Sequence, residues 1–156
     1  MEYLFLRRKE TSSTSQRQRD LLFKAAERHW EEEFVMKGRI SRGIDFLIYK
    51  NLLYHLEMRK VFLDPELSLK KLSAMIETNQ TYLSNVVNRY FECNLKTLVN
   101  SYRIEYSKEM IRTGRYQLEE IPKKCGFASK SPFYAAFKRM TGMTPMQYMG
   151  RLTQSN

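Results

Sequence analysis

Apolar side chains recur at helical spacings of three and four residues along most of the chain, and no segment alternates strictly as a half-buried strand would. An amphipathic helix is predicted over residues 16–37, with an apolar stripe formed by Phe23, Ala26, Trp30 and Phe34. Gly38 and Gly43 bracket a break. A second helix, over 44–59, ends before Asp64-Pro65 because the residue before a proline avoids helical backbone angles. Its apolar face is predicted to consist of Ile44, Leu47, Ile48, Leu52 and Leu56.

Shorter helices with recognisable boundary residues fill the rest of the chain. Ser68 is placed to cap one helix, and a polar turn at 78–80 separates it from a second that reaches about residue 91. A longer helix is predicted over 94–113, and Gly114 ends it. After a short helical stretch at 118–125, two helices are expected to begin at a capping residue followed by proline, namely at Ser131-Pro132 and Thr144-Pro145. The predicted fold is all-α.

A repeat of 50 residues relates two of these helix pairs, because the apolar positions that begin at Leu83 return from Phe133 onward. Each copy has the order short helix, tight turn, helix, which is the plan of a helix-turn-helix. The first copy occupies about 68–91 and the second about 117–141, with the 94–113 helix as connector. A connector of about 20 residues spans roughly 30 Å. Successive major grooves on one face of DNA lie ~34 Å apart, so we expect the second helices of both copies to dock side by side.

Composition narrows the range of functions. The chain has 156 residues, of which 42% are hydrophobic, so it can bury a core. Its 27 Lys and Arg residues against 17 Asp and Glu give a net charge of +10, which favours an anionic partner: nucleic acid first, a membrane surface second. No stretch approaches the ~20 apolar residues of a membrane-spanning helix. Cys93 and Cys125 fall at apolar repeat positions, which predicts buried free thiols rather than a disulfide scaffold or a four-cysteine zinc site.

Motifs for catalysis or cofactor binding are missing from the sequence. It has no phosphate-binding glycine loop, no nucleophile elbow and no zinc-binding helix motif, and its two histidines, His29 and His55, lie outside the repeat. We therefore expect no enzymatic activity, no cofactor and no metal. The alternative from another class is a basic helical protein that binds membrane surfaces. Such a protein needs apolar residues opposite basic ones on one long helix, whereas the apolar residues of these short helices are predicted to face each other.

Five groups of residues follow one another in order through the repeat. They are Leu67-Ser68-Leu69 through Tyr82-Leu83-Ser84, then Tyr102-Arg103-Ile104-Glu105-Tyr106-Ser107-Lys108, Gly126-Phe127 to Phe133, Ala136-Phe137-Lys138-Arg139, and Gly142-Met143-Thr144-Pro145 to Tyr148. Together, over about 62–152, they resemble the AraC/XylS family of bacterial transcription regulators, and the 44–59 helix resembles the family's first helix. The resemblance implies two helix-turn-helix units bridged by a long helix, sequence-specific binding to double-stranded DNA, and recruitment or exclusion of RNA polymerase.

The chain departs from the family pattern at several positions. Glu77 and Glu92 replace glycines that usually stand in the turn of the first unit and after its second helix, so both must tolerate any positive φ required there. Pro122 stands inside the first helix of the second unit and is expected to shift that helix start to Ile121. The residues ahead of the match are too few for the family's usual effector or dimerisation domain, so we expect no small-molecule effector domain in this chain. Residues 1–43 are predicted to be a helical extension or linker, and 44–156 the DNA-binding domain.

The outward face of the second helix in each unit gives the candidate DNA contacts. By the family pattern, polar residues of its first two turns point into the major groove. The predicted base-reading residues are Gln80, Thr81, Ser84 and Asn85 in the first unit, and Lys130, Ser131 and Tyr134 in the second. The predicted phosphate-binding residues are Arg89, Lys123, Lys138 and Arg139. Ala135 stands where family members often carry a long polar side chain, so the second unit is expected to read fewer bases and to contribute mostly phosphate contacts. The alternative is an ordinary solvated helix face.

Two interpretations of the 16–37 helix stay open, since its apolar stripe either packs within the molecule or forms a homodimer interface. Ahead of it, Tyr3 to Leu6 followed by Arg7-Arg8-Lys9 has the order of the end of a membrane helix with basic residues on its cytoplasmic side. The protein is therefore expected in the cytoplasm. It would be tethered at the inner face of the membrane if this chain is the end of a longer membrane-bound regulator.

Overall fold

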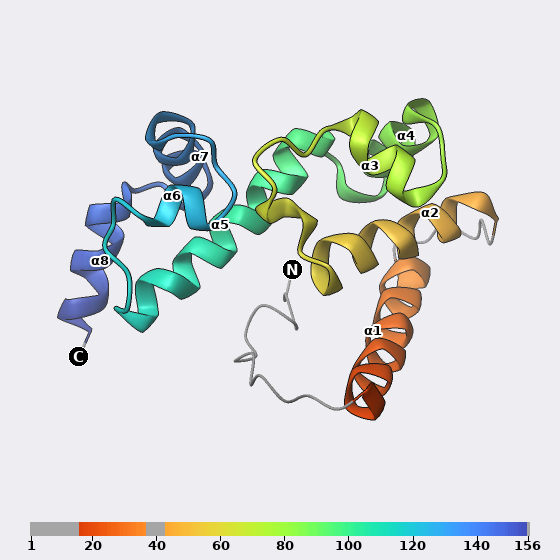
Figure 1. The fold of residues 1–156 in the computed structure, drawn as a ribbon, viewed down its shortest axis with the longest axis horizontal. Helices are drawn as coiled ribbons and strands as arrows, with labels where there is room; N and C mark the ends of the chain where they lie inside the picture. Colours follow the sequence, from red (N-terminus) through yellow and green to blue (C-terminus); the bar gives the residue numbers. More distant parts are fainter. Residues whose placement is uncertain (1–15, 37–42, 156) are drawn as a thin grey trace. The chain divides into compact units, whose positions relative to one another are not determined.

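The computed structural model describes residues 16–36 and 43–155 (Figure 1), and every regular element among them is helical, in agreement with the predicted class. The helices are α1 (Gln16–Met36), α2 (Ile44–Leu53), α3 (Leu69–Ile76), α4 (Gln80–Phe91), α5 (Leu95–Thr113), α6 (Ile121–Lys124), α7 (Lys130–Thr141) and α8 (Pro145–Gln154), with a π-helical turn η1 (Tyr54–Met58) and a 3₁₀ turn η2 (Val61–Leu63). They form two compact units. The first holds α1 to α4 with η1, and the second combines residues 61–67 with the chain from Lys96 onward.

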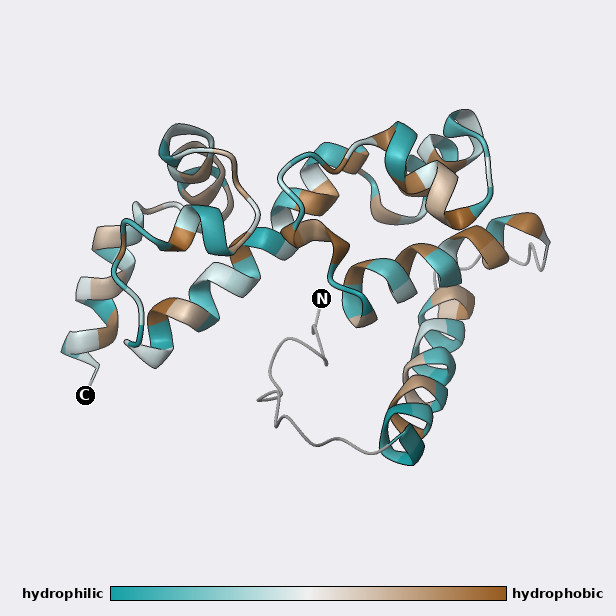
Figure 2. Cartoon of the chain, viewed as in Figure 1, coloured by the Kyte–Doolittle hydropathy of each residue, from teal (hydrophilic) through white to brown (hydrophobic). Residues whose placement is uncertain are grey.

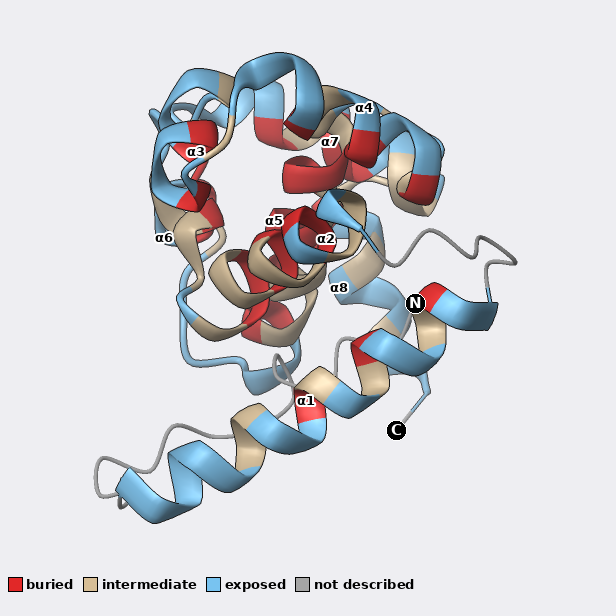
Figure 3. Cartoon of the chain, turned by 90° about the vertical axis from the view of Figure 1, so that its right-hand side faces the viewer, coloured by how far each residue is buried: buried red, intermediate tan, exposed pale blue. Residues whose placement is uncertain are grey.

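The stripe that the sequence predicts on α1 is buried within the first unit. Three of its members are at most 2% exposed, namely Ala26, Trp30 and Phe34. Figure 3 shows buried positions, in red, along α1. The ring of Phe34 lies 5.1 Å from that of Phe46 on α2. Trp30 donates its indole N–H to Oε2 of Glu57 at 3.1 Å. The stripe therefore packs within the molecule, which decides between the two interpretations of this helix.

The predicted apolar face of α2 is wrong at two positions. Ile48, Leu52 and Leu56 are buried as expected, but Ile44 and Leu47 are each 56% exposed. Tyr49 and Leu53 are buried instead. The reason is that α2 packs against α1, α3 and α4 at once, so its buried side is broader than one stripe and is rotated away from Ile44 and Leu47. Apolar residues accordingly dominate α2 in Figure 2.

The contacts of the first unit do not separate residues up to 43 from those that follow, because α1 belongs to this unit. The predicted division into an extension over residues 1–43 and a DNA-binding domain over 44–156 stays a prediction. Gly38, which helped to suggest it, lies outside the described residues, as does the segment from Tyr3 to Lys9. Within the described ranges, no helix combines the length and the apolarity that crossing a membrane requires.

Side-chain caps and left-handed residues define the helix-turn-helix of α3 and α4. Ser68 caps α3 as predicted, since its Oγ accepts a backbone N–H at 3.1 Å, and Asn79 caps α4 in the same way at 2.8 Å. The two helices end at Glu77 and Glu92, with φ of 61° and 57°. Both glutamates thus adopt the positive φ anticipated for them, at a cost of about 1–2 kcal/mol each.

A buried arginine fastens residues 61–67 to the second unit. Arg103 on α5 is 9% exposed. Its Nε donates to the carbonyl oxygen of Phe62 at 2.7 Å, and its Nη2 donates to that of Asp64 at 2.8 Å. Burial lowers the pKa of Arg103. Gly126 passes so close to this clamp that a Cβ added to it would lie 2.2 Å from the carbonyl oxygen of Phe62.

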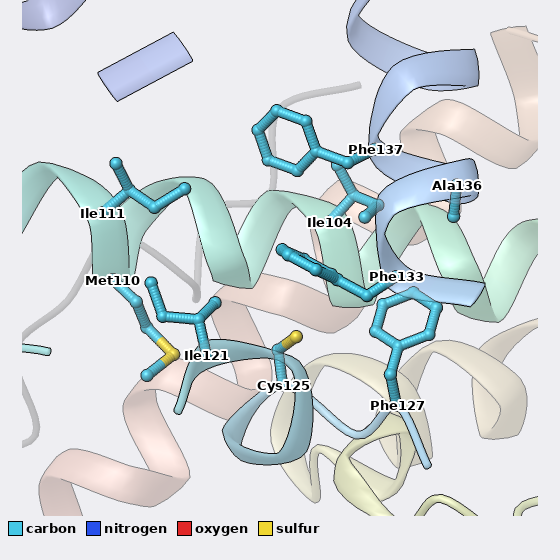
Figure 4. Packing of buried hydrophobic residues seen from close by; sticks show 9 residues of the cluster. All are labelled: Ile104, Met110, Ile111, Ile121, Cys125, Phe127, Phe133, Ala136 and Phe137. Carbon is cyan, nitrogen blue, oxygen red and sulfur yellow. The ribbon is translucent and has the colours of Figure 1, made fainter. Parts of the chain in front are cut away.

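The core of the second unit is built from α5, α6, α7 and two residues between α6 and α7, Cys125 and Phe127. It consists of Ile104, Met110, Ile111, Ile121, Cys125, Phe127, Phe133, Ala136 and Phe137 (Figure 4). Cys125 is fully buried as predicted, and burial raises the pKa of its thiol to about 12. Cys93, in contrast, is only half-buried, so the expectation of two buried thiols holds for one of them.

The helix starts of the second unit follow the sequence at two of three places. α6 begins at Ile121 with Pro122 in its first turn, as expected, although residues 118–120 form a turn rather than helix. α8 begins after Thr144, which makes a capping box with Gln147. α7 begins earlier than predicted, because Ser129 rather than Ser131 precedes it. Backbone N–H groups of a first turn lack helical partners, so a proline fits as its third residue as well as its first.

Candidate nucleic-acid interface

The exposed side of α4 carries hydroxyl and amide groups. Its apolar residues are buried as the sequence predicted, namely Leu83, Val86, Val87 and Tyr90. The base-reading residues predicted for this unit lie outside the core: Gln80, Thr81 and Asn85 are exposed, and Ser84 is half-buried. Asn88 is exposed as well, and its Nδ2 donates to Oγ of Ser84 at 3.5 Å. This face has the groups that a base-reading helix needs.

Arg89, a predicted phosphate-binding residue, is engaged by a carboxylate from α2. Its Nη1 donates to Oδ2 of Asp45 at 3.0 Å, and the hydroxyl of Tyr90 donates to the same oxygen at 3.1 Å. Burial and the hydrogen bond to Asp45 raise the pKa of Tyr90. The Arg89 side chain is 56% exposed and that of Asp45 is 22% exposed, so the pair lies at the surface with its charges balanced.

A groove of about 650 Å³ runs beside α4 and is lined by Asp45, Tyr82, Asn85, Asn88 and Arg89. It brings one predicted base reader and one predicted phosphate contact together with three residues that were not predicted as site residues. The helical period places Asn88 on the outward face, and that signal was present in the sequence. Asp45 precedes Arg89 by 44 residues, so no local spacing could connect the two.

The recognition face of the second unit combines a lysine with an aromatic ring. Lys130 and Ser131 on α7 are exposed, and Tyr134 is half-buried. The Nζ of Lys130 lies 5.0 Å from the centroid of the Tyr134 ring, which itself packs edge-on against Phe133. Ala135 is exposed and offers no polar group. The three predicted base-reading residues therefore share one end of α7, and two of them are in contact.

The predicted phosphate-binding residues of the second unit are all exposed. Lys123 lies near the C-terminal end of α6, and Lys138 and Arg139 lie in the last turn of α7. Cations at these ends also interact favourably with the helix dipole. Lys124, beside Lys123, lies over the ring of Tyr116 at 5.2 Å. These three predicted phosphate-binding residues thus lie exposed near helix ends, whereas the only cation of α4 is paired with Asp45.

A second hollow of about 320 Å³ lies in the first unit, between α1 and α2. It is lined by Glu31, Phe34, Val35, Gly43, Phe46 and Leu47. In the part of the chain that the structure describes, no three His, Cys, Asp or Glu side chains gather to hold a metal ion.

The fold and these helix faces define an all-α protein with two helix-turn-helix units. A family model described as a helix-turn-helix domain matches residues 72–151, which are just over half of the chain. On this match, the chain belongs to the AraC/XylS family of helix-turn-helix regulators, as its motifs indicated.

Known regulators and a solved domain resemble the chain. The TCP pilus virulence regulatory protein of Vibrio cholerae is 38% identical over 58 residues, which are 37% of this chain and 21% of that protein. The melibiose operon regulatory protein of Escherichia coli K12 is 24% identical over 112 residues, 72% of this chain and 36% of that protein. The C-terminal domain of AraT, a response regulator from Geobacillus stearothermophilus, superposes with a TM-score of 0.60 at 22% identity, over 67% of this chain and 84% of that one. The part of this chain that matches therefore corresponds to 21% of the length of the first curated relative and 36% of the length of the second.

Proposed function

We propose that this chain is the DNA-binding region of a sequence-specific transcription regulator. The observation that carries this proposal is that both helix-turn-helix units bury the apolar side of their second helix and display polar or basic side chains on the other. A helix-turn-helix places its second helix in the major groove of DNA. The net charge of +10 favours a polyanionic partner, and both relatives described above are named as regulatory proteins.

In this proposal the two units contribute different contacts. α4 reads bases through Gln80, Thr81, Ser84 and Asn85, and α7 through Lys130, Ser131 and Tyr134. Lys123, Lys138 and Arg139 contact phosphates, which fixes the register of the protein on the duplex without reading sequence. Arg89 would join them only by exchanging Asp45 for a phosphate.

We further propose that α4 and α7 enter successive major grooves on one face of the duplex. The support is the length of α5, whose 19 residues span roughly 28 Å, close to one turn of DNA. Residues 44–156 are the proposed DNA-binding domain, and residues 1–43 its extension.

Selection of bound sequences from a random duplex library, followed by footprinting on the enriched site, tests the proposed function. We expect a defined motif and two protected major-groove segments about 10 base pairs apart. Equal affinity for all duplexes, or a single short protected segment, would contradict the proposal. Flotation with anionic vesicles is the control, because a membrane-surface protein would bind them without preferring any duplex.

Contact with RNA polymerase belongs to the same proposal and is supported by the family membership. In vitro transcription from a promoter that carries the selected site tests it. We expect the chain to change the transcript yield in a manner that depends on the site. An unchanged transcript yield at a protein concentration that saturates the site would count against direct contact between this region and RNA polymerase.

A homodimer through α1 requires a surface other than the buried stripe. Val35 and Met36 on α1 are 57% and 85% exposed, and Ile44 and Leu47 on α2 are each 56% exposed. These four side chains are the proposed contact between two copies. Sedimentation equilibrium of Leu47→Glu beside the parent chain tests it, because a charge at the contact should shift the population toward monomer. A parent chain that is monomeric at all concentrations would exclude this part of the proposal.

A further inference from the structure

We propose that the DNA segment under α4 is an A·T-rich half-site, read by uncharged side chains while Asp45 keeps the only cation of the helix from the bases. This inference rests on the proposed function and names the chemistry that the first unit recognises.

The side chains available on α4 are those that read adenine and thymine. Asn85 and Asn88 are exposed, lie three residues apart on the same side of the helix, and line the same groove. The N–H of an amide donates to N7 of adenine while its oxygen accepts from the N6 amino group, and a threonine methyl packs against the methyl group of thymine. Thr81 is exposed one turn before Asn85. One continuous face therefore carries groups for both members of an A·T pair.

Guanine is recognised chiefly by arginine or lysine, which donates to O6 and N7 together. Arg89 is the only residue of either type in α4. Its guanidinium donates to Asp45 at 3.0 Å, so moving it to a guanine would leave a carboxylate beside the DNA without its counterion. That cost disfavours G·C pairs under this helix.

Cytosine is recognised by a carboxylate that accepts from N4. The carboxylate in the groove is Asp45, whose Oδ2 already accepts from both Arg89 and Tyr90 and which is 22% exposed. The nearest acids along the chain, Glu77 and Glu92, end α3 and α4 instead of lying along the face of α4. Neither member of a G·C pair therefore finds its usual partner.

Base composition of the selected site is the first test. We expect one half of the motif to be A·T-rich. Asn88→Ala should relax the base preference in that half alone. Gln154→Ala, which removes an exposed amide from α8, is the control and should leave the motif unchanged. Replacing one A·T pair by G·C in that half should weaken binding about 5- to 150-fold. A motif whose α4 half is G·C-rich overturns this inference and leaves the proposed function intact. Absence of any motif defeats the proposed function itself.

A change to the DNA tests the same point without altering the protein. 7-Deazaadenine lacks the N7 acceptor but still pairs with thymine. Placed in the A·T-rich half, it should weaken binding at least fivefold, and placed between the two halves it should have little effect. Equal effects at both places would mean that the helix recognises the shape of the duplex rather than adenine, and would overturn the inference.

The role assigned to Asp45 is tested by Asp45→Asn, in which the amide oxygen can still accept from Tyr90. Freed from its carboxylate, Arg89 should add one phosphate contact, which steepens the salt slope by about 0.9 and strengthens binding up to about eightfold at 0.1 M salt. Glu32→Gln removes the same charge from an exposed position on α1 and should leave the slope unchanged. Equal slopes for both variants, or loss of affinity in Asp45→Asn with a normal unfolding midpoint, would show that Asp45 does not restrain Arg89.

Discussion

Gly126→Ala is expected to destabilise the second unit through a clash that the structure specifies. Gly126 has φ of 97°, and a Cβ there would lie 2.2 Å from the carbonyl oxygen of Phe62, which accepts from Arg103. An alanine at positive φ costs about 1–2 kcal/mol. Displacing the carbonyl also weakens a hydrogen bond to a charged donor, worth about 1.5–3 kcal/mol. The expected loss in free energy of unfolding is therefore about 2.5–5 kcal/mol, a large fraction of the 5–15 kcal/mol typical of a domain.

Urea unfolding followed by circular dichroism measures this loss, and Gly114→Ala is the matched control. Gly114 has φ of 63°, but nothing lies within 4 Å of its added Cβ, so only the backbone cost applies. We expect Gly114→Ala to lose about 1–2 kcal/mol. Equal losses in the two variants would refute the close approach of Gly126 to the Phe62 carbonyl and would mean that residues 61–67 are not held as described.

Three further predictions follow from single contacts. Trp30→Phe keeps the ring in the core but leaves Glu57, which is 7% exposed, without its indole donor, so urea unfolding should show a loss of about 1–3 kcal/mol. Glu77→Gly should raise thermal stability, by up to about 1 kcal/mol, because glycine adopts φ of 61° without the strain of a side chain; a loss would mean that the glutamate side chain stabilises the turn. Lys138→Ala should weaken binding to selected and random duplexes alike and lower the salt slope by about 1, and a changed base preference would assign it a reading role instead.

Most of the helices could be predicted because their signals are local. Ser68 and Thr144 cap helices within three residues of themselves, and Pro122 fixes the start of α6 through its own missing N–H. The buried side of α2 could not be predicted in the same way. Ile44 fits the apolar period, but which side of the helix is buried depends on α1, α3 and α4 packing around it, and that information is not contained in the spacing.

The residues of the candidate site can likewise be separated into those that local spacing predicts and those that depend on how the helices pack. Thr81 and Asn85 could be placed outward from the helical period alone. The partner of Arg89 could not, because Asp45 reaches it only after α2 and α4 have packed together, and an isolated acid in the sequence of α2 gives no sign of it. The sequence alone therefore cannot show whether a basic side chain is available to bind phosphate or is already paired with a carboxylate.

Arg103 holds residues 61–67, which connect the two units along the chain, against α5. Residues 61–67 lie between α2 and α3 in sequence yet belong to the second unit, so the chain passes between the units at three places rather than one. Arg103→Ala removes both guanidinium donors that reach this segment. The buried carbonyl of Phe62 loses its Arg103 donor, at a cost of about 1–3 kcal/mol, whereas the carbonyl of Asp64 still accepts from the backbone N–H of Leu67. The second unit should therefore lose stability and two of the three connections should loosen.

The single tryptophan makes this loss separable, because Trp30 lies in the first unit. In Arg103→Ala, the urea midpoint by circular dichroism should fall further than the midpoint by tryptophan fluorescence. Arg112→Ala is the control, since Arg112 is an exposed residue of the same helix that interacts with Glu109 and Tyr148 instead of with residues 61–67. If Arg103→Ala shifts both midpoints equally, the units unfold together regardless of this clamp. If it shifts neither more than Arg112→Ala does, Arg103 is not what holds residues 61–67 to the second unit.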